Sequence, residues 1–228
     1  MAYENSKLTS LQDIQRDLTD IINTIYDHPY IDGLEKKQIA KDKLEIFICE
    51  QYKIIANDKR NFAFMISKTS NDLASKLFTD CLNAEINALE NLNIFAEAIN
   101  IDKRKMESYE PLSGCQAYTN YLTKLAVYGS DAEILTALII DLPVWGHNCD
   151  KMSSALQKNY GFDKKSCTFL DSFATPLPKE FTDKSKELIL SSVVSSYDEK
   201  TIRTAARLIL EYEILFWETI YEHSTVNQ

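Results

Sequence analysis

Hydrophobic residues recur at every third or fourth position along most of the chain, which is the spacing of amphipathic helices. One apolar stripe near the start contains Leu11, Ile14, Leu18, Ile21, Ile22 and Ile25. The pattern predicts helices over about residues 8–26, 40–57, 70–99, 115–128, 131–159, 165–173, 178–194 and 198–222. Long helices joined by short loops favour antiparallel neighbours, so we expect an all-α helical bundle.

Turn-forming residues mark the ends of these helices. The first helix should end at 27–29, because a residue that precedes proline disfavours the α conformation. Ser130 or Asp131 is the expected N-cap of the fifth predicted helix, and Gly161 should stop that helix in a left-handed conformation. No linker or repeat divides the sequence, so we predict one domain over residues 1–228 with a core at about 8–222.

Composition and charge narrow the functional classes. The formal net charge is -9 without a basic block, which disfavours nucleic-acid binding. No apolar run reaches the roughly 18 residues of a membrane span, and the first ten residues lack the apolar stretch of a signal peptide. Five widely spaced cysteines without a CxxC pair predict neither disulfides nor a zinc site. We expect a cytoplasmic protein.

Two carboxylates fall on apolar helix faces, where an unpaired charge costs several kcal/mol. Glu213 shares its face with residues such as Leu210 and Trp217, and it is either a satisfied core carboxylate or a pocket acid/base with a raised pKa. Asp141 shares a face with Leu138 and precedes Pro143, which should kink the helix and free backbone carbonyls. Asp141 either satisfies that kink or a neighbouring cap, or has a functional role.

Other polar positions are weaker candidates. Glu50 and Gln51 are adjacent, and one of them should point inward, either as a helix contact or as a ligand-binding group. Tyr118 aligns with Leu122 on an apolar face, where an aromatic residue is more often core than site. No inward Glu-x-x-His pair exists for a di-iron site, and His147 has ordinary packing as its expected role, so we predict no metal and no cofactor. Nucleotide-binding, serine-hydrolase and zincin motifs are also absent from the sequence.

Several segments together resemble TenA-type proteins (thiaminase II). The similar segments are His28-Pro29-Tyr30-Ile31 with Gly33, the run Phe47–Gln51, Ala117-Tyr118-Thr119, Ala132–Leu135, and Tyr212-Glu213 followed by Phe216-Trp217. Their order and spacing hold over about residues 20–220. The resemblance implies a haem-oxygenase-like bundle, usually a homotetramer, without metal or haem. It also implies hydrolysis of an aminomethylpyrimidine, in which water or a thiol displaces an amine.

The resemblance assigns pocket positions to particular residues of this chain. The family's last-helix glutamate corresponds to Glu213 and its middle-helix tyrosine to Tyr118. The family aspartate corresponds to Gln51, next to Glu50. Counted without gaps from the tyrosine, the family's nucleophilic cysteine corresponds to Asp141; a shift of two or three residues places it at Pro143 or Val144. Two further pocket aromatics correspond to Trp145 and Phe173.

The chain departs from the family at the reactive positions. The usual cysteine is absent, and Cys149 lies about two helical turns beyond its expected place. Family members without the cysteine use acidic residues, so Asp141 and Glu213 are the predicted acid/base pair, with one carboxyl ionised and the other protonated.

The leading functional hypothesis is therefore a TenA-like hydrolase that cleaves a C–N bond of a thiamin-related aminopyrimidine. The alternatives are an oxygenase or redox enzyme, because relatives on this bundle bind di-iron or pyrroloquinoline precursors, and a non-catalytic small-molecule binder. The family is also associated with transcriptional activation. The acidic net charge of this chain disfavours direct binding to DNA. The expected partners are a pyrimidine-like aromatic ligand and further copies of the chain, in a dimer or tetramer.

Overall fold

The computed structural model describes residues 11–225, and every regular element within them is helical. The helices are α1 (Leu11–Asp17), α2 (Thr19–Tyr26), α3 (Pro29–Glu35), the 3-10 helix η1 (Lys41–Lys43), α4 (Leu44–Lys68), α5 (Asp72–Glu97), α6 (Lys103–Ser108), α7 (Ser113–Tyr128), α8 (Asp131–Asn159), α9 (Thr168–Ala174), α10 (Lys179–Ser192) and α11 (Ser196–Thr225).

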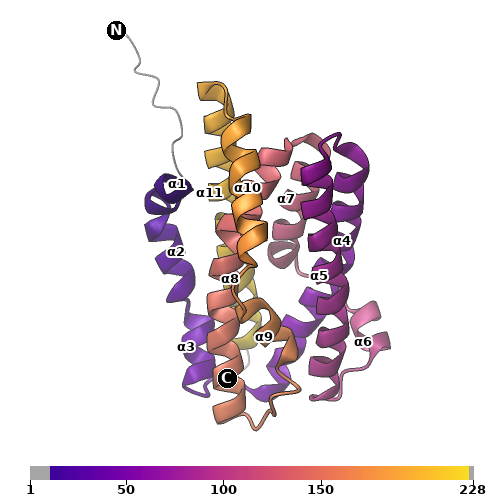
Figure 1. The fold of residues 1–228 in the computed structure, drawn as a ribbon. Helices are drawn as coiled ribbons and strands as arrows, with labels where there is room; N and C mark the ends of the chain where they lie inside the picture. Colours follow the sequence, from indigo (N-terminus) through magenta and orange to yellow (C-terminus); the bar gives the residue numbers. More distant parts are fainter. Residues whose placement is uncertain (1–10, 226–228) are drawn as a thin grey trace.

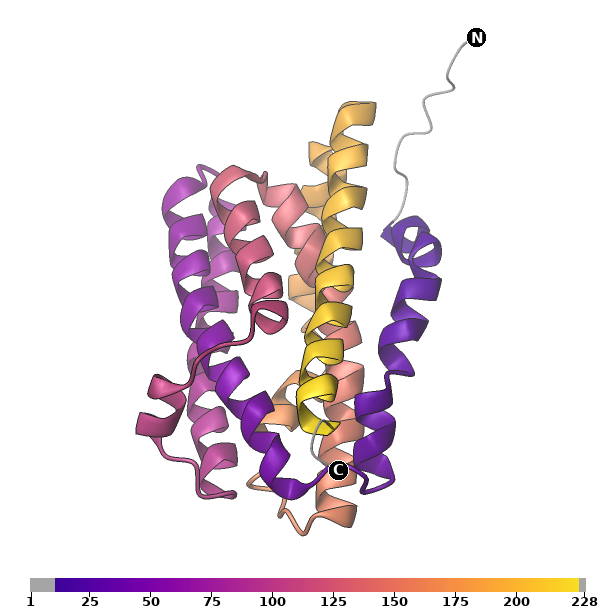
Figure 2. The same cartoon turned by 180° about the vertical axis from the view of Figure 1, so that it is seen from behind.

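The long helices form one bundle (Figure 1). Helix α4 packs between α5 and α7, and α11 packs on both α7 and α8. The short helices α1–α3 follow one another along one side of the bundle, where α2 and α3 contact α8 and α11 (Figure 2). Helix α9 lies against α8 and α5, and α10 covers α8 beside it. This arrangement surrounds the middle of the bundle with α4, α7, α8 and α11.

Local signals in the sequence explain several helix ends. The Ser130 hydroxyl accepts a hydrogen bond from the Glu133 N–H at 3.2 Å, and the Glu133 carboxylate accepts one from the Ser130 N–H at 2.9 Å. This capping box confirms Ser130 as the N-cap of α8. Gly161 has φ of +75° just beyond the C-terminal end of α8, which confirms the predicted left-handed stop. Helix α8 runs through Pro143 without ending there.

The structure also corrects some predicted boundaries. Helix α4 extends to Lys68, eleven residues past the predicted end at 57, because its second half buries residues such as Phe62 and Met65 against the bundle. The first predicted helix is divided at Leu18 into α1 and α2, and its positions 8–10 lie outside the described residues. The sequence pattern missed the short helices α3 and α6, which are shorter than the window over which periodicity is visible.

None of the helices within residues 11–225 combines the length and apolar character needed to cross a bilayer.

Candidate active site

Three polar side chains from three helices meet inside the bundle. The Tyr118 hydroxyl, from α7, donates a hydrogen bond to Asp141 Oδ2, from α8, at 2.7 Å. Glu213, from α11, accepts a hydrogen bond from Trp217 Nε1 at 2.9 Å, one helical turn further along. Asp141 is 1% exposed and Glu213 is 2% exposed, so both carboxyl groups are removed from bulk water. The two carboxylates singled out by helix periodicity therefore lie at one place.

Each of these carboxyl groups has one oxygen that no surrounding donor satisfies. Among the described residues, no N–H or hydroxyl donor reaches Asp141 Oδ1 or Glu213 Oε2. No lysine or arginine of the described chain forms an ion pair with either group. Because an isolated buried charge is costly, the pair must carry a proton, and a carboxyl–carboxylate hydrogen bond between them accounts for it.

The surroundings of Asp141 and Glu213 raise the pKa of both carboxyl groups. Burial raises the pKa of Asp141 to about 7, although the hydrogen bonds from Tyr118 and Glu213 lower it in part. Burial raises the pKa of Glu213 well above its ordinary value, and the charge of Asp141 raises it further. Because the two groups interact, they titrate as a pair, and burial favours a proton on the pair.

A further buried carboxylate belongs to the same polar region. Asp58, on α4, is 4% exposed, and its Oδ1 accepts hydrogen bonds from the Thr119 hydroxyl and from Asn61 Nδ2, the latter at 3.1 Å. Burial raises the pKa of Asp58 to about 7, and the charge of Asp141 contributes. Asp58 does not stand out in the sequence pattern, because the predicted helix ends at residue 57. The available signal is its position two turns after Gln51 on the same helix face.

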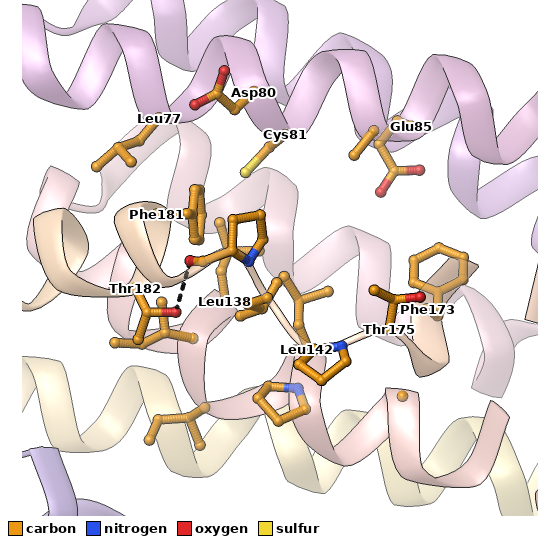
Figure 3. A pocket seen from close by; sticks show the side chains of 18 of the residues that line it. Leu77, Asp80, Cys81, Glu85, Leu138, Leu142, Phe173, Thr175, Phe181 and Thr182 are labelled. Atoms are coloured by element: carbon orange, nitrogen blue, oxygen red, sulfur yellow. Dashed lines mark hydrogen bonds between the residues drawn. The ribbon is translucent and has the colours of Figure 1, made fainter. Parts of the chain in front are cut away.

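A cavity of about 1270 Å³ reaches this region from the surface. It is bounded by α1, α4, α5, α7, α8, α9 and α10, and Figure 3 shows Phe173 and Glu85 among its lining residues. Tyr118 and Asp58 line its inner part, whereas Asp141 and Glu213 are not among the lining residues. Tyr118 therefore joins the cavity to the buried acid pair, because it lines the cavity and its hydroxyl contacts Asp141.

The two predicted aromatic residues occupy different positions around this cavity. Phe173 lines it, whereas Trp145 lies behind it, stacked between Phe47 at 6.0 Å and Trp217 at 5.0 Å between ring centroids. The rings of Trp145 and Phe173 still meet edge to face at 6.1 Å. Gly146 allows this approach, because a Cβ there would lie 2.5 Å from the Phe173 carbonyl oxygen.

Glu50 and Gln51 do not join the buried pair or line the cavity. Glu50 Oε1 accepts a hydrogen bond from the Leu112 N–H at 2.6 Å, and its Oε2 accepts one from Gln116 Nε2 at 2.8 Å. Both oxygens therefore hold the start of α7 against α4. Gln51 is 5% exposed and its amide makes no hydrogen bond to any described residue. Ligand binding by Glu50 or Gln51 stays a prediction.

Cys149 lies in the neighbourhood of the acid pair as a thiol. It is fully buried, and burial, followed by the charge of Glu213, raises its pKa well above the ordinary value. A thiol held protonated is a poor nucleophile, so the surroundings of Cys149 disfavour it as a replacement for the family cysteine. No group of three or more potential metal ligands is found among the His, Cys, Asp and Glu side chains of residues 11–225.

Solved structures of other proteins share this fold. A domain with a haem-oxygenase-like fold from Shewanella denitrificans superposes with a TM-score of 0.76 at 16% identity, covering 95% of this chain and 94% of that one. This likeness confirms the predicted fold class, an all-α bundle of the haem-oxygenase-like type.

Sequence similarity identifies the family. The profile of the TENA/THI-4/PQQC family matches residues 15–223, and the chain belongs to that family. An aminopyrimidine aminohydrolase from Halalkalibacterium halodurans is 26% identical over 115 residues, which are 50% of this chain and 51% of that protein. An aminopyrimidine aminohydrolase from Helicobacter pylori is 20% identical over 213 residues, which are 86% of this chain and 90% of that protein. The first alignment thus spans about half the length of the relative, and the second spans most of it.

Proposed function

We propose that the protein hydrolyses the C–N bond of an aminomethylpyrimidine-type compound and that Asp141 and Glu213 are its acid/base pair. The observation that carries this proposal is the buried carboxyl pair linked by Tyr118 to a cavity large enough for a flat heterocycle. The names of the two aminohydrolase relatives support the substrate class.

The reaction needs a proton to be taken up and another to be delivered. Water attacks the methylene carbon, a C–O bond forms, the C–N bond breaks, and the amine leaves with the bonding electron pair and gains a proton. A proton from water can pass to Tyr118 as Tyr118 passes its own to Asp141, since that hydrogen bond is already formed at 2.7 Å. The pair can return a proton to the departing amine, so its charge at the end equals its charge at the start.

Turnover measurements on three variants test the proposal. We expect the purified protein to release ammonia from a 5-aminomethylpyrimidine, and Asp141→Asn and Glu213→Gln each to lower kcat by about 100-fold or more. The Glu45→Gln variant, which changes only an ion pair with Lys105 at the start of α4, is the control and should keep full activity. Full turnover in both carboxyl variants would refute the assignment of the pair, and absence of ammonia release from the parent protein would refute the activity.

Binding without catalysis is the second candidate. It is favoured by one observation: Asp141 and Glu213 do not themselves line the cavity. In that case calorimetry would show saturable binding of the pyrimidine while no ammonia is released. Assembly into a dimer or tetramer and a cytoplasmic location also remain proposals, and sedimentation equilibrium tests the first of them.

A further inference from the structure

A second carboxyl pair lies on the α4–α5 wall of the cavity, and its Asp58 belongs to the same polar region as Asp141. Asp58 comes from α4 and Glu85 from α5, and both line the cavity. In Figure 3 the Glu85 carboxylate points toward the cavity, on the side opposite Leu142 and Thr175. Burial raises the pKa of Glu85, and the charge of Asp58 raises it further.

Most oxygens of this second pair have no partner within residues 11–225. Asp58 uses Oδ1 for both of its hydrogen bonds, so Oδ2 is left without a donor although the residue is 4% exposed. Glu85 receives no hydrogen bond and forms no ion pair with any described residue. An ionised carboxylate only accepts hydrogen bonds. A carboxylate oxygen that has no donor within the protein can therefore accept a hydrogen bond from a ligand.

The lysines near the cavity do not neutralise this pair. Lys76 and Lys184 both pair with Glu180, at 3.7 Å and 2.5 Å, rather than with the two cavity acids. Lys59 lowers the pKa of Glu85 only as the last of its causes. The wall therefore presents two acids that form no ion pair with a described lysine or arginine, so a cation that enters the cavity would supply their first direct counter-charge.

We propose that Asp58 and Glu85 bind a cationic amino group, such as a protonated primary amine or an amidinium, on the ligand that occupies the cavity. Such a group carries several N–H donors, and charge-assisted hydrogen bonds from it satisfy both acids at once. The site thus selects aromatic ligands that carry a positively charged nitrogen over neutral ligands of the same shape. This inference rests on the proposed function only for the position of the ligand, and it does not depend on hydrolysis.

Paired binding measurements separate this inference from the proposed hydrolysis. Calorimetry on the Glu213→Gln protein, whose turnover we expect to be at least about 100-fold slower, compares a 5-aminomethylpyrimidine with its 5-hydroxymethyl analogue. We expect the amine to bind about 10-fold more tightly or better. Asp58→Asn and Glu85→Gln, added one at a time, should each remove most of this preference while changing the affinity for the neutral analogue less than about twofold.

The matched control is Asp80→Asn, which changes an acid of the same cavity that is exposed to solvent. Its preference should stay within about twofold of the parent, because water screens its charge. Equal affinities for the two probes in the parent, or a preference retained after both Asp58→Asn and Glu85→Gln, would overturn the inference. Should Asp58→Asn fail to fold, Glu85→Gln alone decides, since that side chain is only partly buried.

Discussion

At the scale of single residues, Tyr118 has the central position. Its ring lines the cavity, and its hydroxyl donates to Asp141, so it is the contact between solvent-accessible space and a carboxyl pair that is 1% and 2% exposed. Burial, followed by the charge of Asp141, raises the pKa of Tyr118 well above its ordinary value, which keeps the hydroxyl proton in place. A proton can therefore move through this group without leaving a stable phenolate there.

Replacing that hydroxyl tests the connection. Tyr118→Phe keeps the ring and removes the O–H, so we expect kcat to fall about 100-fold while KM changes only a few-fold. Tyr121→Phe is the control, since Tyr121 lies on the same helix, is 7% exposed and packs against Tyr212 at 5.1 Å between ring centroids. Steady-state kinetics on both proteins measure the effect, and an unchanged kcat for Tyr118→Phe would exclude the relay.

At the scale of helices, the start of α7 sets the position of Tyr118. Glu50, from α4, accepts hydrogen bonds from the Leu112 N–H and the Gln116 amide, and these contacts fix the first turn of α7. Glu45 lies near the beginning of α4, as Glu50 does, but it forms only a surface ion pair with Lys105. The two glutamates therefore have different energetic roles despite their similar positions in the sequence.

Unfolding experiments distinguish these roles. We expect Glu50→Ala to lower the free energy of unfolding by roughly 2 kcal/mol, because it leaves a backbone donor unsatisfied. Glu45→Ala should cost roughly 0–1 kcal/mol, as is usual for exposed ion pairs. Urea titrations of both variants provide the comparison. Normal stability with weakened pyrimidine binding in Glu50→Ala would instead support the ligand-binding role that the sequence suggested.

The helices themselves were largely predictable because their signals are local. The capping box at Ser130 and the left-handed Gly161 lie within a few residues of the ends they define. The end of α4 was misjudged because its second half is stabilised by contacts with α5 and α7, which the sequence of α4 alone does not contain. Periodicity could place Asp141 and Glu213 on inward faces, but only packing brings them to the same point.

The second carboxyl pair was hidden from the sequence for a similar reason. Asp58 and Glu85 are ordinary acids on their own helices, and they become a pair only where α4 packs on α5 beside the cavity. Glu50 and Gln51 show the reverse case: they match positions of the family motif, yet they lie away from the cavity. The family resemblance predicts the positions of pocket residues. It does not predict which polar groups of this chain line the cavity.

At the scale of the whole molecule, buried acids should govern how stability depends on pH. Asp58 and Asp141 have pKa values raised to about 7 in the folded state, whereas unfolded aspartates ionise near their ordinary value. Between these values the folded state binds more protons, so the stabilising contribution is present at acidic pH and is lost as pH rises toward about 7. Surface ion pairs have the opposite effect on stability, because their carboxylates become protonated, and the pairs are lost, as the pH falls.

Thermal unfolding tests this linkage. We expect the unfolding midpoint of the parent protein to fall by roughly 4–8 °C from about pH 5.5 to about pH 8. A protein with Asp58→Asn and Asp141→Asn should show a clearly smaller change, because the groups responsible no longer titrate. Calorimetric scans of both proteins across this range supply the data; identical slopes would mean that these acids do not control the pH response.

The measurement that tests the central claim most directly is the pH dependence of kcat/KM for an aminomethylpyrimidine, in the parent protein and in Glu213→Gln. Asp141 must be ionised and Glu213 protonated for the proposed reaction, so kcat/KM should rise through about pH 7 and fall again at higher pH. In Glu213→Gln the rate should be low and the fall at high pH should disappear. A parent profile that is flat around pH 7, or a variant that keeps the full bell shape, would contradict the assignment of Asp141 and Glu213 as the acid/base pair.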